Sequence, residues 1–319
     1  MKYKNFIYLL SVSVVVFLMM VFSSSAGENY IVIHGDEQYQ YAETCFREQA
    51  YQSALTAYKR FVHFFPEDSR IRQAKFKTGL CLFHLKDYAG ALEVFNAIAL
   101  PFSESRISSE SRFMAIQIHM IKGKYSAAEQ MLQNFLTFAR KKKIQDRIYS
   151  ELAWIYLKRA GKMEKNSLDT AALWLDRISA QNSPLYHTDQ IKDCISEIRA
   201  MDFKNPALAG ALSIVPGGGF VYCRRYRDGL TAFLLNSALI IAAAGAFDDG
   251  NPALGAVISF VEAGFYSGNI YGAVTSAHKY NQGKIAPVIE YMENHFHGRD
   301  VSQTSSSALN YMIGFRIRF

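Results

Sequence analysis

The sequence predicts an all-α protein in which a series of helix pairs precedes a helical membrane domain. Three observations support this: a residue pattern that recurs every 37 residues, a change in composition near residue 203, and two long apolar runs after it. The 319 residues are enough for two modest domains. We expect helical repeats over residues 35–202, a membrane domain over 205–280, and a C-terminal helix and tail over 281–319.

The N-terminus has the features of a targeting segment. Lys2 and Lys4 precede an uncharged apolar stretch over residues 6–22, and Ser24-Ser25-Ala26 supplies the small residues that a signal peptidase requires. Residues 1–26 are therefore predicted to be a signal peptide, with an uncleaved N-terminal anchor as the alternative. Both alternatives place the repeats outside the cytoplasm.

The repeated pattern combines an aromatic, a small and a large residue at fixed spacing. Its three copies are Tyr51, Ala54 and Tyr58; Tyr88, Ala91 and Phe95; and Tyr125, Ala128 and Leu132. The pattern resembles that of the tetratricopeptide family, whose unit is an antiparallel helix pair of about 34 residues. The resemblance implies a small residue nine positions before the tyrosine, where two helices approach closely. Ala42 and Gly79 match it, but the third copy has Ile116 there, so its helices are expected to splay.

A fourth, degenerate helix pair is expected after these copies. Its apolar residues have helical spacing and are Tyr149, Leu152, Tyr156, Ala171, Leu175 and Ile178, with a polar loop over residues 161–166. One more amphipathic helix, carrying Ile191, Ile195 and Ile198, leads to the boundary near Lys204-Asn205-Pro206.

The resemblance implies a binding surface, because helix pairs of this kind stack and leave a groove rather than a closed pocket. We expect first-helix positions that packing does not use to contact a protein or peptide of mixed charge: Gln40, Glu43, Arg47, Lys77, His84 and Gln117. The alternative is that these residues are solvated polar positions with no ligand.

Two apolar runs follow residue 228. Residues 229–247 contain no charge and residues 252–277 contain only Glu262, so each approaches the roughly 20 residues that cross a bilayer. Residues 248–251 form a short turn, which predicts an antiparallel hairpin. The apolar residues 206–222 could add a third crossing or form a re-entrant segment; we favour three membrane segments over two.

A glycine-rich motif precedes the first run. It consists of Pro216, Gly217, Gly219, Tyr222, Arg224, Arg225 and Gly229. It resembles the signature before the hairpin in the TM2-type group of small bacterial membrane domains, which implies an architecture but no biochemical role. The positive-inside rule would place the arginines and His278-Lys279 in the cytoplasm and Asp248-Asp249 on the other side.

Glu262 is costly if it faces lipid. We expect it to pair with Arg224 or Tyr271 or to lie near the interface, with an ion pathway as the alternative.

Other functional classes lack the residues they need. The net charge of +7 is spread along the chain, so nucleic acid is not an expected partner. The four cysteines form no CxxC motif, and we expect Cys45 and Cys81 to pack as small apolar residues rather than pair. No nucleophile with its base and no nucleotide-binding fingerprint is found, so we expect neither an enzyme nor a cofactor or metal.

The expected function is that of a non-enzymatic scaffold of the bacterial cell envelope, with periplasmic repeats that bind a protein or peptide and a membrane domain that contacts lipids. The oligomeric state is left open. The alternatives are a membrane channel or translocation component, and an outer-membrane assembly factor. The last rests on the alternating tail from Tyr311 to Phe319, which predicts a strand.

Overall fold

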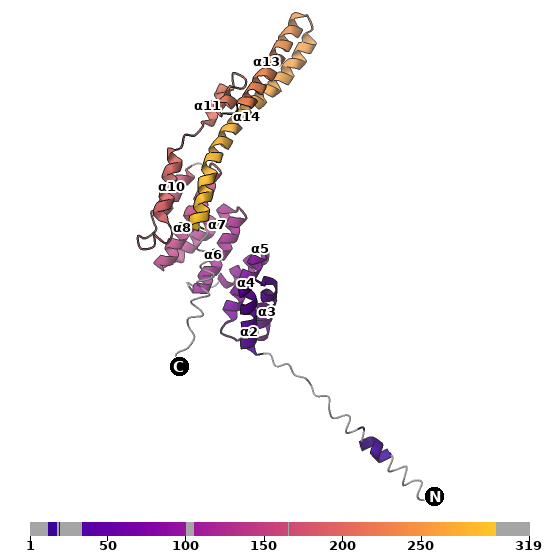
Figure 1. Ribbon diagram of the computed structural model, residues 1–319, viewed down its shortest axis with the longest axis vertical. Coiled ribbons are helices and arrows are strands. Elements are labelled where there is room, and N and C mark those ends of the chain that lie inside the picture. The colour runs from indigo at the N-terminus through magenta and orange to yellow at the C-terminus, as the bar shows by residue number, and fades with distance from the viewer. Residues whose placement is uncertain (1–11, 18, 20–33, 100–104, 165, 298–319) are drawn as a thin grey trace, which may run out of the picture. The chain divides into compact units, whose positions relative to one another are not determined.

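The computed structural model describes residues 12–17, 19, 34–99, 105–164 and 166–297, and the regular secondary structure in these ranges is entirely helical (Figure 1). The predicted all-α class is therefore confirmed. Residues 12–17 lie in a helix, but the proposed cleavage site and the alternating tail fall outside the described residues. The chain divides into two compact units, residues 1–100 and 101–319, so the expected boundary near residue 203 does not coincide with this division.

The first unit contains two antiparallel helix pairs. They are α2 (Gly35–Arg47) with α3 (Tyr51–Phe64), and α4 (Ile71–His84) with α5 (Tyr88–Ala99). Consecutive helices pack in series, and the small and large residues of the repeated pattern are buried between them. Gly79 shows why a small residue is needed, since a Cβ there would lie 2.6 Å from Phe95 Cε1.

The second unit begins with two more helix pairs and a single helix. They are α6 (Arg106–Ile121) with α7 (Tyr125–Phe138), α8 (Lys142–Gly161) with α9 (Ser167–Leu175), and α10 (Thr188–Ala200). The fourth pair and the isoleucine-bearing helix are therefore present as predicted. Ile116 is buried, and α6 and α7 contact each other more sparsely than the pairs of the first unit do, in keeping with the predicted splay.

The turn inside each helix pair repeats as well. Gln49, Lys86, Gly123 and Met163 all have left-handed backbone angles, with φ of 60°, 63°, 68° and 63°. The amide of the following residue donates to a carbonyl five residues earlier, as in Ala50 N to Cys45 O at 2.9 Å. This hydrogen bond closes a Schellman-type turn, a position where glycine is the residue without steric cost. The shared turn identifies α8–α9 as a fourth copy of the same unit.

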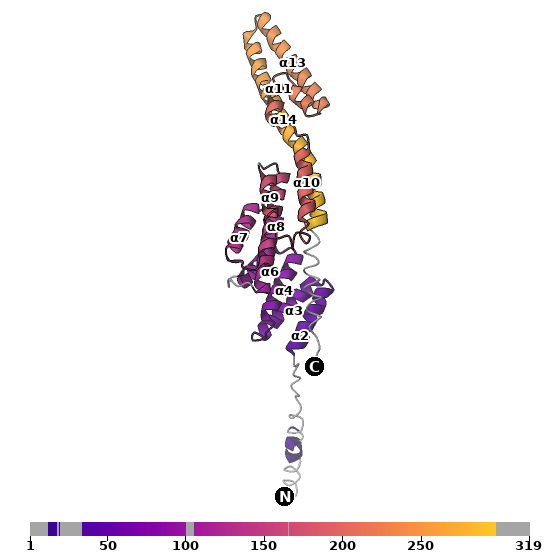
Figure 2. The ribbon, with the colours of Figure 1, turned by 90° about the vertical axis from the view of Figure 1, so that its left-hand side faces the viewer.

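The rest of the second unit consists of two short helices, a long hairpin and a terminal π-helical turn. These are α11 (Pro206–Leu212), α12 (Gly218–Tyr222), α13 (Tyr226–Asp248), α14 (Pro252–Met292) and η1 (Glu293–His297). As predicted, α13 and α14 are joined by a short turn after Asp248 and lie side by side (Figures 1 and 2).

Helix α14 has 41 residues, about 60 Å in length, and continues through residues 280 and 281 without a break. Its last turns pack on α8 and α10, where Ile285, Ile289 and Met292 share a core with Trp154 and Ile195. Glu293 forms an ion pair with Lys158, and His297 Nε2 lies 3.5 Å from Glu151 Oε2. The end of α14 therefore belongs to the core of the later repeats.

Candidate functional site

The residues expected to bind a partner lie on three first helices. Gln40, Arg47 and His84 are exposed, while Glu43 and Gln117 are half-buried. His84 stacks on Tyr51, with ring centroids 4.2 Å apart, and this contact desolvates one face of the imidazole and lowers the pKa of His84. Gln117 belongs to the second unit, so the structure brings only the other five together in one body.

Lys77 occupies an internal position instead of the open one expected. Its side chain is 5% exposed; its Nζ lies 3.4 Å from Glu43 Oε2 and 4.2 Å from the centre of the Phe46 ring. Burial lowers the pKa of Lys77, although the Glu43 carboxylate acts in the opposite direction. Tyr58 donates to the same carboxylate at 2.6 Å. Glu43 and Lys77 therefore join adjacent helix pairs, which leaves Gln40, Arg47 and His84 as the exposed candidates.

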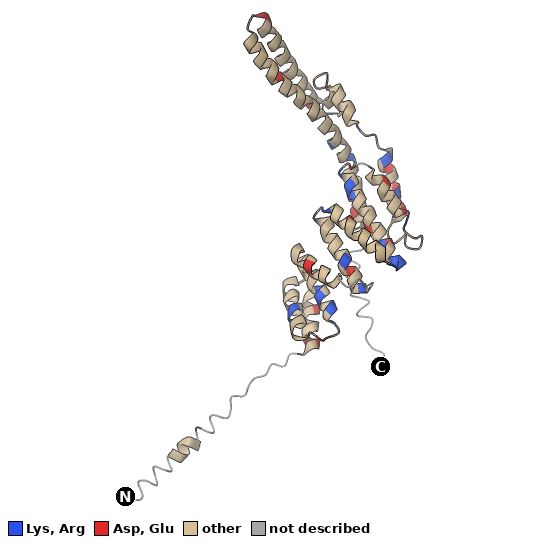
Figure 3. Cartoon of the chain, turned by 180° about the vertical axis from the view of Figure 1, so that it is seen from behind, with Lys and Arg blue, Asp and Glu red and all other residues tan. Residues whose placement is uncertain are grey.

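The hairpin of α13 and α14 is apolar on its outside. Its large exposed side chains include Leu230, Leu234, Ile241, Val257 and Phe260, and Phe260 is 84% exposed. Figure 3 shows the hairpin almost free of charge, with acidic residues at its tip. Of the helices described, α13 is the one both long and apolar enough to span a membrane. Its 23 residues extend about 34 Å, against a hydrocarbon core of about 30 Å.

The inside of this hairpin contains small and polar residues. One series of buried residues recurs every seven positions on both helices: Gly229, Asn236 and Ala243 on α13, and Gly255, Glu262, Asn269 and Ser276 on α14. A seven-residue repeat keeps one face of each helix against its neighbour. Polar groups that would be costly in lipid are therefore gathered in the seam between the two helices. Of this series, only Gly229 and Glu262 were predicted as site residues, although the same spacing is visible in the apolar runs.

Helices α11 and α12 form a wedge, residues 206–222, that lies against α14. Ala209 and Cys223, near its two ends, share a small core with Ala273 and Ala277. The turn between its helices reaches further along α14, where Tyr266 donates from its hydroxyl to Ile214 O at 2.8 Å. The wedge thus starts and ends at the same level of the hairpin. The expected third crossing is wrong, because α11 has only seven residues, about 10 Å, and the chain turns back at Pro216-Gly217.

Asn269 holds the turn of the wedge. Its Oδ1 accepts from Gly217 N at 3.0 Å, and its Nδ2 donates to Ser213 O at 3.0 Å. The amide of Asn269 thus satisfies two backbone groups of an irregular turn, which would otherwise lack partners. Asn281 clamps the incoming chain in the same way, with both ends of its amide bonded to the Lys204 backbone at 2.8 Å.

The glycines of the motif permit close packing of the wedge. Gly217 has φ of 84°, and a Cβ there would lie 2.0 Å from Gly229 O. A Cβ on Gly219 would lie 2.1 Å from Ala209 O. The Tyr222 hydroxyl accepts from Asn205 N at 3.0 Å. The motif is therefore explained as the packing requirement of a tight turn-back beside two helices.

Glu262 does not make the expected pair with Arg224 or Tyr271. Its side chain is 8% exposed, and neither carboxylate oxygen has a hydrogen-bond partner in the described part of the chain. Tyr271 points outward and Arg224 belongs to the other end of the hairpin, next to Tyr280. Glu262 is thus a buried acidic group in the seam without a counter-ion there.

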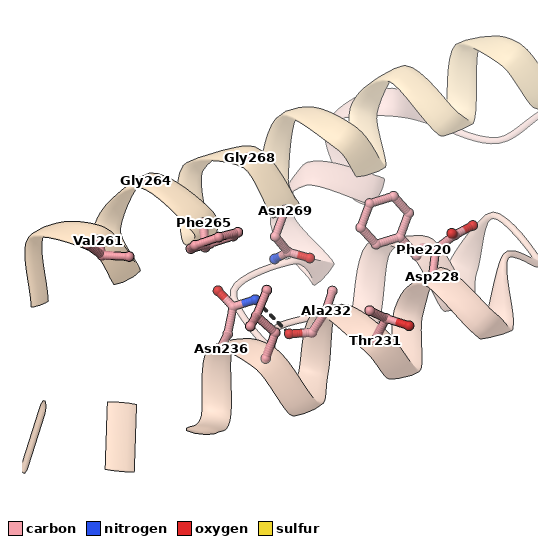
Figure 4. Close-up of a pocket in the computed structure, with 11 residues that line it drawn as sticks. Phe220, Asp228, Thr231, Ala232, Asn236, Val261, Gly264, Phe265, Gly268 and Asn269 are labelled. Atoms are coloured by element: carbon pink, nitrogen blue, oxygen red, sulfur yellow. Dashed lines mark hydrogen bonds between the residues drawn. The ribbon is translucent and has the colours of Figure 1, made fainter. Parts of the chain in front are cut away.

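An open groove of about 500 Å³ lies beside the seam, between α12, α13 and α14. Figure 4 shows Asn236 and Asn269 converging on it, with Phe220 and Phe265 also along it and Gly264 and Gly268 on α14. Asn236 is 2% exposed and donates to Ala232 O at 2.6 Å, while its Oδ1 has no partner. The groove resembles an incomplete helix interface and contains no pairing of nucleophile and base.

Comparison with known proteins gives the chain no family. No protein-family model matches it, and no curated protein matches its sequence. The class of protein defined by the structure is thus a helical repeat-like protein with a candidate membrane helix.

Proposed function

We propose that the protein is a non-enzymatic scaffold of the bacterial cell envelope, whose tetratricopeptide-like repeats bind a protein or peptide and whose TM2-like hairpin anchors them in a membrane. The observation that carries the proposal is the inverted burial of the hairpin, apolar outside and polar inside, on a helix that continues into the core of the repeats. Such an exterior requires lipid or a large apolar partner.

The proposed location of the repeats is the periplasm, and the N-terminal segment supports it. The basic residues near Arg224 and Lys279 lie at the end of the hairpin that leads into the repeats, and Asp248-Asp249 at the other. The positive-inside rule alone would favour the opposite orientation, so the orientation must be measured.

Single cysteines in a cysteine-free variant test this orientation. With an impermeant maleimide on intact spheroplasts, we expect labelling at Lys59→Cys, on α3, and none at Asp249→Cys until the membrane is permeabilised. The reverse labelling would place the repeats in the cytoplasm and leave the anchor itself intact.

Partner binding is tested with photoreactive residues on the exposed first-helix face. We expect Gln40 and Arg47 to capture one protein in cells, whereas Lys59, which is exposed on the second helix of the same pair, should not. Equal capture from all three positions would contradict a specific binding face.

A channel or translocation component is the second candidate, and the unpartnered Glu262 favours it. A pathway that uses this carboxylate should lose conductance in Glu262→Gln when reconstituted in planar bilayers, whereas a scaffold should conduct neither before nor after the change.

A further inference from the structure

We propose that a cluster of three cations at the base of the hairpin is a binding site for the phosphate of an anionic phospholipid. The cluster consists of Lys204, Arg224 and Lys284, which surround the ring of Tyr280. The inference rests on the proposed membrane anchor and adds the lipid class that the anchor selects.

The three cations converge from separate segments. Lys204 Nζ lies 5.8 Å from the centre of the Tyr280 ring, Lys284 Nζ lies 5.2 Å from it, and Arg224 Cζ lies 6.0 Å from it. Lys204 Nζ also lies 4.6 Å from the ring of Tyr222. Lys204 precedes the wedge, Arg224 follows it, and Lys284 is on α14. The fold thus gathers positive charge that is dispersed in the sequence.

The position of each cation is fixed by backbone contacts. Asn281 holds the Lys204 backbone at both its amide and its carbonyl, and Lys284 donates to Asp202 O at 2.8 Å. Arg224 has a left-handed backbone, with φ of 64°, which turns the chain between α12 and α13. The ring contacts add a modest cation–π attraction but leave the charge unbalanced.

No acidic side chain neutralises the cluster in the part of the chain that the structure describes. The nearest acidic residues in sequence are Asp202, which offers its backbone carbonyl to Lys284, and Asp228, which pairs with Arg225 at 2.6 Å. Arg225 also donates to Ser276 at 2.7 Å, so it is already partnered. Like charges around one ring repel one another, and a bound anion would relieve that repulsion.

The level of the cluster suits a lipid headgroup. Arg224 lies five residues before the uncharged run that begins at Gly229, and Tyr280 lies three residues after the apolar run that ends at Ala277. Tyrosine and basic residues at the ends of membrane segments occupy the interface, where the phosphates lie. Exposed Leu208, Leu212 and Val221 on the wedge would contact the acyl chains of the same lipid.

The experiment uses the full chain incorporated into lipid nanodiscs. One set contains phosphatidylcholine alone, and another contains phosphatidylcholine with about a tenth of fluorescent phosphatidylglycerol. Energy transfer from a dye on Tyr226→Cys, introduced into the cysteine-free variant, to the labelled lipid reports local enrichment. We expect enrichment of several-fold over the bulk composition, falling as NaCl is raised from about 50 to about 500 mM.

Three variants define the site. Lys204→Gln/Arg224→Gln/Lys284→Gln should lower the apparent affinity about a hundredfold, since each basic residue near an anionic surface contributes roughly fivefold. Lys204→Arg/Arg224→Lys/Lys284→Arg keeps the charge and should retain enrichment. Lys59→Gln/Arg60→Gln/Lys75→Gln removes the same charge from exposed positions in the first unit and should have no effect.

The outcomes separate this inference from the proposed anchor. Failure of the unaltered protein to enter phosphatidylcholine nanodiscs would contradict the anchor. Normal incorporation without phosphatidylglycerol enrichment, or equal loss in the matched control variant, would overturn the lipid site alone. Binding of free glycerol phosphate to the cluster in detergent, without phosphatidylglycerol enrichment in nanodiscs, would assign the cluster to a soluble phosphate. That outcome would also overturn the lipid site.

Discussion

The helix pairs and the apolar hairpin are built from the same secondary structure but differ in where their large apolar side chains lie. In α2–α9 the large buried side chains are mostly apolar, with Tyr58, Phe95 and Leu132 in the interior, and the few buried charges such as Lys77 and Asp146 have partners. In α13–α14 the interior holds Asn236, Glu262 and Asn269, while Ile241 and Phe260 face outward. The difference is the one expected if lipid surrounds the hairpin, because polar groups are costly in lipid, whereas apolar groups are costly in water.

The largest effect is expected when a charge is placed on the outside of the hairpin and compared with a charge on the outside of the repeats. Ile241→Lys with Phe260→Lys should release the chain from carbonate-washed membranes, because a lysine at mid-membrane costs about 2.5–3.5 kcal/mol. The control is Leu173→Lys on α9, which is also an exposed apolar residue and should stay membrane-bound. If the double variant resists extraction as the original does, lipid does not surround the hairpin.

The next test removes the clamp of the wedge. Asn269→Leu leaves Gly217 N and Ser213 O without partners in an apolar setting, at about 1–3 kcal/mol for each group. Thermal unfolding in detergent should occur at a clearly lower temperature. Ser267→Ala, two residues away, removes only a bond to the Ala263 carbonyl of its own helix and should change little. Equal effects of the two variants would show that the clamp has no special role.

The repeats offer a buried acidic group that, unlike Glu262, is fully partnered. Asp146 accepts from Asn182 Nδ2 at 2.7 Å and from Ser179 N at 3.2 Å, and Lys142 Nζ lies 3.1 Å away. Burial raises the pKa of Asp146, but these hydrogen bonds outweigh it and hold the pKa below its ordinary value of 3.8.

The lowered pKa of Asp146 gives a pH-dependent prediction. The Asp146 carboxylate stabilises the fold above about pH 4, and this stabilisation is lost as pH falls through its lowered folded-state pKa. The reason is that only the ionised carboxylate accepts hydrogen bonds from every donor around it. Asp146→Asn should lower the free energy of unfolding by about 1–3 kcal/mol at neutral pH. Under strongly acidic conditions the free energies of unfolding of the variant and the original protein should become more alike. Unfolding curves at several pH values measure it, and a difference independent of pH would contradict the assignment.

The smallest expected effects concern the turns of the helix pairs. Lys86→Gly should raise the free energy of unfolding by about 0.5 kcal/mol, since glycine adopts the left-handed conformation without strain. Gly123→Ala should lower it by about 1 kcal/mol for the same reason. Denaturant titration distinguishes the two signs. A gain from both substitutions would mean that these turns are not equivalent.

The sequence predicted the repeats better than the membrane region. Tyr51, Ala54 and Tyr58 recur because the same core is built again at each pair, so their spacing alone indicates the packing. The wedge could not be predicted in this way, because hydropathy treats Pro216 and the glycines as breaks in an apolar run and does not indicate that the chain turns back. The two asparagine clamps depend on contacts across 52–77 residues. Lys77 was predicted to lie on the open binding face but is buried, because its partner, Glu43, lies on the preceding helix pair.

The unbroken course of α14 has a mechanical consequence. A helix of about 60 Å is stiff; its first half forms the apolar hairpin with α13 and its last turns pack against α8 and α10. Membrane helices tilt when bilayer thickness changes. If the proposed membrane anchor is correct, a tilt of about 10° would move the far end of α14 by about 10 Å, so a local thinning of the lipid would move the later repeats.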